Sequence, residues 1–105
     1  MVEQVFHYST GTEKAIEKLI MDDQVHYIHM LLNQGEGLPE HFSNSRVYMT
    51  VVKGTLTIQL DDQEAHSYEA GTVLKIPYQT KMNVGNKDEA LLELIVVKAP
   101  APGTF

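Results

Sequence analysis

Apolar and polar residues alternate along several short stretches of this chain, which is the pattern of a β-strand with one buried face. The clearest stretch is 55–60, where Leu56, Ile58 and Leu60 share one face and threonine or glutamine lies between them. Turn residues separate this stretch from similar β-rich segments at 24–32, 46–52, 65–69, 72–76 and 90–97. Short strands that recur about every 8–12 residues predict an all-β sandwich or barrel.

Composition indicates a single globular domain spanning residues 1–105, with 43% hydrophobic residues. The chain has no cysteine, which excludes disulfides and thiolate metal sites. No apolar run approaches the roughly 20 residues that span a bilayer, and the N-terminus lacks the basic start and apolar stretch of a signal peptide. We therefore predict a cytoplasmic protein without a membrane partner. The net charge of −6, with eight scattered Lys and Arg residues, argues against a nucleic-acid partner.

Two regions carry a specific pattern of glycine, proline and polar positions. The first runs from Gly35 through His41-Phe-Ser43 and Val47 to Gly54, and the second contains Gly71, Pro77 and Asn86. Together they resemble the two cupin motifs, G-x5-H-x-H-x3-4-E-x6-G and G-x5-P-x-G-x2-H-x3-N. This resemblance implies a cupin-type double-stranded β-helix, which is a jelly-roll barrel. We expect its core over about 24–98, with a short N-terminal strand extension and a proline-rich C-terminal tail.

Residues 12–20 fit this fold less well. Ala15, Ile16, Leu19 and Ile20 fall at helical spacing behind Thr12, a candidate N-cap, so local rules favour a two-turn helix. A helix this short is marginal without tertiary packing. Because small cupins usually have a strand here, the resemblance leads us to expect a strand.

The metal ligands of the cupin family are mostly absent. Where the family has three histidines and one glutamate, only His41 matches, because Ser43, Val47 and Met82 occupy the other ligand positions. Gln79 takes the place of the middle glycine of the second motif. Valine and methionine bring no charge to offset a dication in an apolar interior. We therefore predict no cofactor, with a divalent metal as the alternative.

A divalent metal would need further ligands, and two other histidines are candidates for them. His26 and His29 precede the first motif on one predicted strand, and their spacing of three puts them on opposite faces, so at most one faces inward with His41. Such a pair, with Glu40 or Glu93 nearby, would rebuild a metal site. The competing interpretation of a lone inward histidine is a core imidazole satisfied by a hydrogen bond.

The thioether of Met82 raises a further alternative, because thioethers are soft ligands that suit Cu(I) better than Fe(II), Mn(II) or Zn(II). Methionine is, however, also the usual filler of irregular gaps in a hydrophobic core.

Without a metal, the resemblance predicts a mostly apolar pocket inside the barrel. Its lining residues by analogy with the family are His41, Ser43, Val47, Met49, Tyr78 and Met82. Arg46 lies where the motif turns inward, and its guanidinium would hold a carboxylate or phosphate at the mouth. Alternatively, Arg46 is a solvated surface residue and the others simply fill a small core.

Three functions are compatible with these residues. We favour a small-molecule binding or sensing module with a degenerate metal site. The alternative is a metal-dependent small-molecule enzyme, of the oxygenase or isomerase type, with a rearranged ligand set. The third is an assembly role. We also predict a homodimer, because small cupins pair through their sheets and the β-branched strands at 51–52 and 95–97 offer a surface for a second copy.

Overall fold

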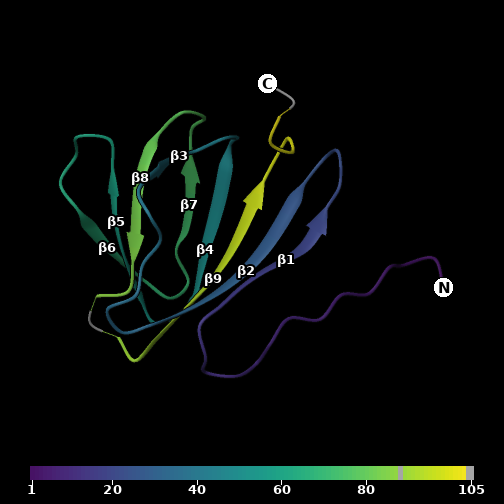
Figure 1. Cartoon of the computed structure of the whole chain (residues 1–105), viewed down its shortest axis with the longest axis horizontal. Helices are drawn as coiled ribbons and strands as arrows, with labels where there is room; N and C mark the ends of the chain where they lie inside the picture. The colour runs from purple at the N-terminus through teal and green to yellow at the C-terminus, as the bar shows by residue number, and fades with distance from the viewer. Residues whose placement is uncertain (88, 104–105) are drawn as a thin grey trace.

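The computed structural model describes residues 1–87 and 89–103, and these residues form nine β-strands and no helix (Figure 1). No segment of this described part is therefore a helix that could cross a membrane. The strands are β1 (Ala15–Met21), β2 (His26–Asn33), β3 (His41–Phe42), β4 (Val47–Lys53), β5 (Thr55–Leu60), β6 (His66–Glu69), β7 (Val73–Ile76), β8 (Lys81–Gly85) and β9 (Leu91–Lys98). The all-β prediction is confirmed.

The strands form two antiparallel sheets that face each other. The large sheet has the strand order β1-β2-β9-β4-β7, and the small sheet has the order β3-β8-β5-β6 (Figure 1). Sequence neighbours such as β4 and β5 lie in different sheets, so the chain crosses repeatedly from one sheet to the other. This is the two-layered jelly-roll arrangement that the motifs predict.

The core lies between the two sheets and follows from the alternation in the sequence. In β5, Leu56 and Ile58 are buried, and in β9 every second residue from Leu92 to Val96 is buried. Strand β4 buries Val47, Met49 and Val51 in the same way. Successive side chains of a strand point to opposite faces, so the intervening residues of β9 lie on the outer face of the large sheet.

Residues 15–21 are a strand, as the resemblance predicts and the local helical pattern does not. β1 pairs with β2, and the register shifts between Lys18 and Ile20. A β-bulge of this kind puts one extra residue into a strand. It lets the adjacent residues Leu19 and Ile20 both be half-buried, which explains an apolar spacing that no regular strand shows.

Gln79 has a backbone that the cupin motif reserves for glycine. It lies between β7 and β8 with φ of 62°, in the left-handed region, and its N–H donates to the Ser43 carbonyl at 2.9 Å. An L-residue in this region costs about 1–2 kcal/mol of backbone strain. Glycine removes most of that strain, but it loses more conformational entropy on folding than any other residue.

We expect the Gln79→Gly variant to be more stable than the wild type by about 0.5–1 kcal/mol. Urea unfolding followed by circular dichroism measures this free energy. A matched Gln63→Gly variant, in a turn without positive φ, should lose stability instead. A destabilised Gln79→Gly variant would contradict the assignment of strain to this position.

Candidate functional site

His41 lies in β3, opposite Met82 of β8, and is half-buried at one end of the barrel. Its Nδ1 lies 2.8 Å from the carbonyl oxygen of Pro39. Because a carbonyl oxygen only accepts hydrogen bonds, Nδ1 carries the proton. The other ring nitrogen, Nε2, is then an acceptor in the neutral imidazole. The backbone thus fixes the ring so that His41 offers a lone pair at Nε2.

The barrel interior beside His41 contains a small cavity of about 40 Å³. Its lining residues are Met30, Leu38, His41, Val47, Met49, Met82, Val84, Val96 and Lys98. A cavity of this size holds one water molecule or a few ligand atoms, far less than the roughly 300–1,000 Å³ of a pocket for drug-sized ligands. Most of the barrel interior is therefore packed core, with a short apolar recess at the His41 end.

Lys98 also lines the cavity, although neither sequence motif contains it. It continues the inward alternation of Leu92, Leu94 and Val96 at the end of β9, and it pairs with Val47 of β4. Burial lowers the pKa of its amine, and repulsion from Lys18 lowers it further. Its Nζ donates to Oδ1 of Asn44 at 3.1 Å. The alternation of inward-facing residues along β9, extended by two residues, would have identified Lys98 from the sequence.

Ser43, at the position of the second metal histidine, is buried and fully engaged by the backbone. Its Oγ donates to the Pro77 carbonyl at 2.6 Å and accepts from the Thr80 N–H at 2.8 Å. Ser43 therefore joins two loops and does not line the cavity.

The donors around the cavity do not fit a first-row divalent metal. They are the His41 imidazole, three thioethers and the Lys98 amine, without a carboxylate among the described residues. Fe(II), Mn(II) and Zn(II) sites in proteins use several imidazole or carboxylate ligands. The metal chemistry usual in cupins is therefore not supported by this set of side chains.

Arg46 and Tyr78 lie apart from His41. Together with Lys75, Ile76 and Pro77 they line a separate depression of about 300 Å³ beside β7. The structure thus brings together His41, Val47, Met49 and Met82 from the predicted pocket, and it places Ser43, Arg46 and Tyr78 outside the cavity.

His26 and His29 lie on opposite sides of β2. His26 shares the inward-facing side with Ile28 and pairs with Lys98, but it does not line the cavity. His29 lies on the outer face of the large sheet, so its ring is not directed at the barrel interior.

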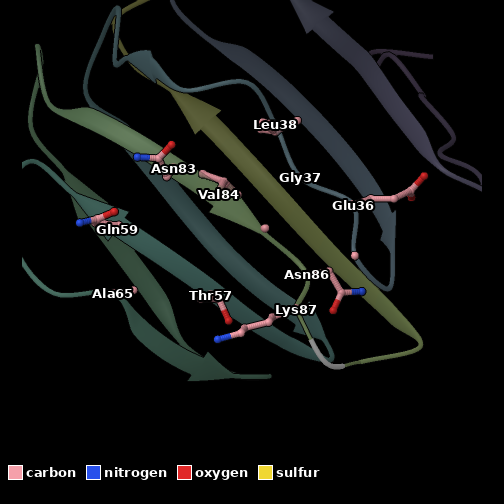
Figure 2. A pocket seen from close by; sticks show the side chains of 12 residues that line it. Glu36, Gly37, Leu38, Thr57, Gln59, Ala65, Asn83, Val84, Asn86 and Lys87 are labelled. Atoms are coloured by element: carbon pink, nitrogen blue, oxygen red, sulfur yellow. The ribbon is translucent and has the colours of Figure 1, made fainter.

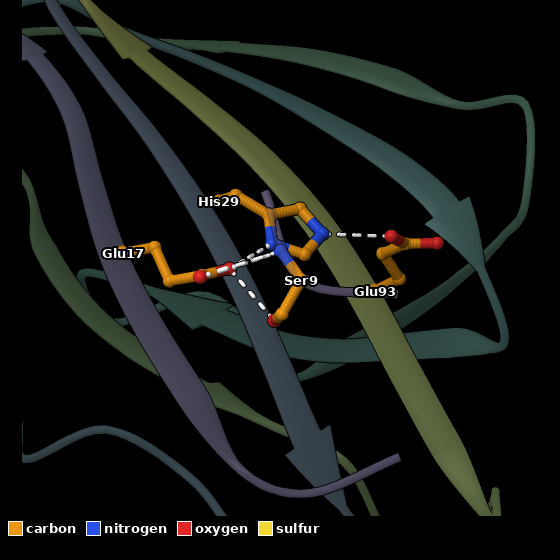
Figure 3. A network of polar contacts seen from close by, with 4 residues as sticks. All are labelled: Ser9, Glu17, His29 and Glu93. Carbon is orange, nitrogen blue, oxygen red and sulfur yellow. Dashed lines mark hydrogen bonds and ion pairs between the residues drawn. The ribbon is translucent and has the colours of Figure 1, made fainter. Parts of the chain in front are cut away.

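The His29 ring is completely buried, at 0% exposure, between two carboxylates (Figure 3). Its Nδ1 lies 2.8 Å from Oε1 of Glu17, and its Nε2 lies 2.7 Å from Oε2 of Glu93. The Tyr8 ring stacks on it with centroids 4.0 Å apart, and Ser9 hydrogen bonds to Glu17. Since a carboxylate only accepts, both ring nitrogens donate when the imidazole is protonated. This network holds the N-terminal segment on the large sheet.

We expect the Glu17 carboxylate to make stability depend on acid pH. The hydrogen bond from His29 is the main cause that lowers the pKa of Glu17 below its ordinary value of 4.5, and the Ser9 N–H adds to it. Because the folded pKa lies below the unfolded pKa, the stabilisation is complete above about pH 4.5 and is lost as the pH falls through the folded pKa. Glu17→Gln should therefore lose less stability than wild type on acidification.

Urea unfolding at neutral pH and at about pH 3 measures this difference. Glu64→Gln, at an exposed position, is the matched control and should keep the acid dependence of the wild type. An identical acid dependence in Glu17→Gln would contradict the role of this carboxylate.

A depression of about 430 Å³ lies on the outer face of the small sheet and is open to solvent (Figure 2). Thr57 and Gln59 of β5, Asn83 of β8 and the loop 35–38 border it. Leu38 and Val84 line both this groove and the interior cavity, so their side chains separate the two. The groove is wide, and His41 is not among its lining residues.

Comparisons with known proteins agree with this geometry. No family model matches the chain. The uncharacterised protein MJ0764 of Methanocaldococcus jannaschii is 39% identical over 103 residues, covering 97% of this chain and 89% of the relative. The crystal structure of that protein, described as an RmlC-like cupin with a double-stranded β-helix fold, superposes with a TM-score of 0.94 over 97% of this chain and 94% of the other.

More distant structures share the fold alone. A cupin superfamily protein from Desulfitobacterium hafniense, at 16% identity, has a TM-score of 0.75 and covers 89% of this chain and 83% of its own. The cupin domain of Schizosaccharomyces pombe Cnp3, at 11% identity, has a TM-score of 0.72 over 81% of this chain and 59% of the other. The relative that is 39% identical over nearly the whole chain, together with the two motifs and the two facing sheets, shows that the chain belongs to the RmlC-like cupins.

Proposed function

We propose that this cupin is a small-molecule binding module whose ligand enters the barrel end between His41 and Lys98. The observation that carries the proposal is the pairing of an imidazole and an amine at the edge of one apolar cavity. Binding pockets for small molecules are mostly apolar with a few placed polar atoms that orient the ligand. The described lining of this cavity has that composition.

The two polar groups suggest a small hydroxy carboxylate as the ligand class. The Lys98 ammonium attracts a carboxylate, and the lone pair at Nε2 of His41 accepts a hydrogen bond from a hydroxyl. The recess of about 40 Å³ has room for a methyl or methylene group of the ligand. Three methionines line the recess, and their flexible side chains allow it to widen slightly.

This function requires no divalent metal. Lys98 would repel a dication at the cavity, and no carboxylate among the described lining residues offsets that repulsion. The alternative of a metalloenzyme with a rearranged ligand set has no favouring observation, because His29 lies on the outer face and is held by Glu17 and Glu93.

Calorimetric titration with glycolate, lactate and propanoate tests the proposal. We expect a hydroxy acid to bind more tightly than propanoate, and we expect Lys98→Met to weaken that binding at least about tenfold. His41→Phe should remove the preference for the hydroxyl. Lys75→Met, which removes a lysine outside the cavity, is the matched control and should bind like the wild type. Equal binding by wild type and Lys98→Met, or no binding of any of these acids, would overturn the proposal.

A further inference from the structure

Another cleft, of about 250 Å³, lies on the outer face of the large sheet beneath the N-terminal segment. Its lining residues are Tyr8, Thr10, Gly11, Thr12, Leu31, Lys53, Leu91 and Glu93. None of them borders the His41 cavity, so this is a separate place in the fold. Residues 8–12 form one wall of the cleft, and the strands β2, β4 and β9 contribute the rest.

A β-bulge brings Lys53 to this face. Val51 of β4 pairs with Leu94 of β9, and both side chains are buried in the core. The next pair is Lys53 with Glu93, because the register shifts and Val52 is the extra residue. Bulges redirect side chains in this way. The lysine therefore stands opposite Glu93 on the outer face, where a regular register would have placed Val52.

Glu93 is fixed on the other side of the cleft. Its Oε2 accepts from Nε2 of His29 at 2.7 Å, and Glu17 holds the other side of the buried His29 ring (Figure 3). The Tyr8 ring stacks on the same imidazole. Within residues 1–87 and 89–103, Oε1 of Glu93 has no hydrogen-bond partner. The same carboxylate is thus preorganised by one oxygen and available through the other.

Lys53 and Glu93 carry opposite charges and lie opposite each other, but no ion pair joins them in the described part of the chain. Lys53 makes no ion pair within 4.0 Å with any other of these described residues either. Cross-strand pairs of opposite charge normally attract each other. A ligand that carries both a positive and a negative charge would pair with Glu93 and Lys53 at the same time.

We infer that this cleft binds a small zwitterion of the α-amino acid class. The ligand ammonium donates to Oε1 of Glu93, and the ligand carboxylate accepts from Nζ of Lys53. The side chains of Leu31 and Leu91 supply apolar surface for the ligand's own side chain, and Thr10 and Thr12 also line the cleft. The volume of about 250 Å³ suits a single small or medium-sized amino acid.

Thermal unfolding with each proteinogenic L-amino acid added singly tests this inference. We expect at least one amino acid to raise the Tm by about 4 °C or more at saturation. Its amine analogue without the carboxylate and its acid analogue without the ammonium should each bind at least about tenfold more weakly by calorimetry. Failure of every amino acid to raise the Tm, or equal binding of either analogue, would overturn the inference.

Two variants locate the site. Lys53→Met and Glu93→Gln should each weaken binding at least about tenfold, and the glutamine amide oxygen still accepts from His29. The controls Lys75→Met and Glu64→Gln should bind the amino acid like the wild type. Lys98→Met should also bind it normally, because Lys98 borders the other cavity, and this result separates the cleft from the proposed hydroxy-acid site. Wild-type affinity in both Lys53→Met and Glu93→Gln would place the amino acid elsewhere and refute the assignment.

Discussion

Replacing Gly54 with alanine is expected to lower the free energy of unfolding by about 2–5 kcal/mol. Gly54 links β4 to β5 with φ of +82°, in the left-handed region. A Cβ at this position would collide with the carbonyl oxygen of Leu91 and lie 3.2 Å from the Cα of Leu92. Left-handed strain costs about 1–2 kcal/mol and overpacking against fixed backbone about 1–3 kcal/mol. Leu92 is fully buried, so the backbone there has little freedom to move.

Gly71→Ala is the matched control for this prediction. Gly71 also has positive φ, at +94°, but a methyl group added there would meet no described heavy atom within 4 Å beyond its chain neighbours. The Gly71→Ala variant should therefore lose only about 1–2 kcal/mol, which is the cost of left-handed backbone strain. Urea unfolding followed by circular dichroism compares the two variants. Equal losses at both glycines would show that the collision at Leu91 has no energetic consequence.

Replacing Asn86 with alanine should cost about 2–4 kcal/mol. The side chain is 1% exposed and makes three hydrogen bonds, because Nδ2 donates to the carbonyls of Leu32 and Glu89 at 2.9 Å each and Oδ1 accepts from the Glu89 N–H at 3.1 Å. In the alanine variant, these backbone groups lose their hydrogen bonds to the side-chain amide of Asn86. Each buried polar group that loses its partner costs about 1–3 kcal/mol unless water replaces it.

Asn83→Ala provides the comparison for Asn86. Asn83 also donates a side-chain hydrogen bond, to Oε2 of Glu40 at 2.9 Å, but this bond is exposed to water. Its loss should cost less than about 1 kcal/mol because water satisfies the same groups. If both variants lost the same free energy in urea unfolding, the internal bonds of Asn86 would not explain why asparagine occupies this motif position.

The sequence predicts most of the fold because its strands alternate regularly. Strands β4, β5 and β9 follow their apolar periodicity, and the motif glycines and Asn86 lie at turns that need them. β3 and β8 are not predicted, because β3 has only two residues and β8 mixes lysine and asparagine with its two apolar residues. The resemblance to small cupins, and not the local pattern, predicts β1 as a strand.

The candidate sites are less predictable for physical reasons. Periodicity assigns a face to each side chain, so it could have placed Lys98 inward, but it cannot say that Arg46 and His41 line different hollows. The bulge beside Val52 depends on pairing between distant strands, so no local pattern indicates that Lys53 faces Glu93. The N-terminal segment covers His29 through Tyr8, a tertiary contact. The homodimer stays a prediction.

The most direct test of the central claim is the metal content of the protein. The claim is that this barrel binds its ligand through His41 and Lys98 without a divalent metal, because the donors around its cavity do not form a divalent site. Elemental mass spectrometry of tag-free protein, purified without chelator, should be run beside the His41→Ala variant. We expect metal well below one equivalent in the wild type and no change in the variant. Near one equivalent in the wild type, lost in His41→Ala, would contradict it.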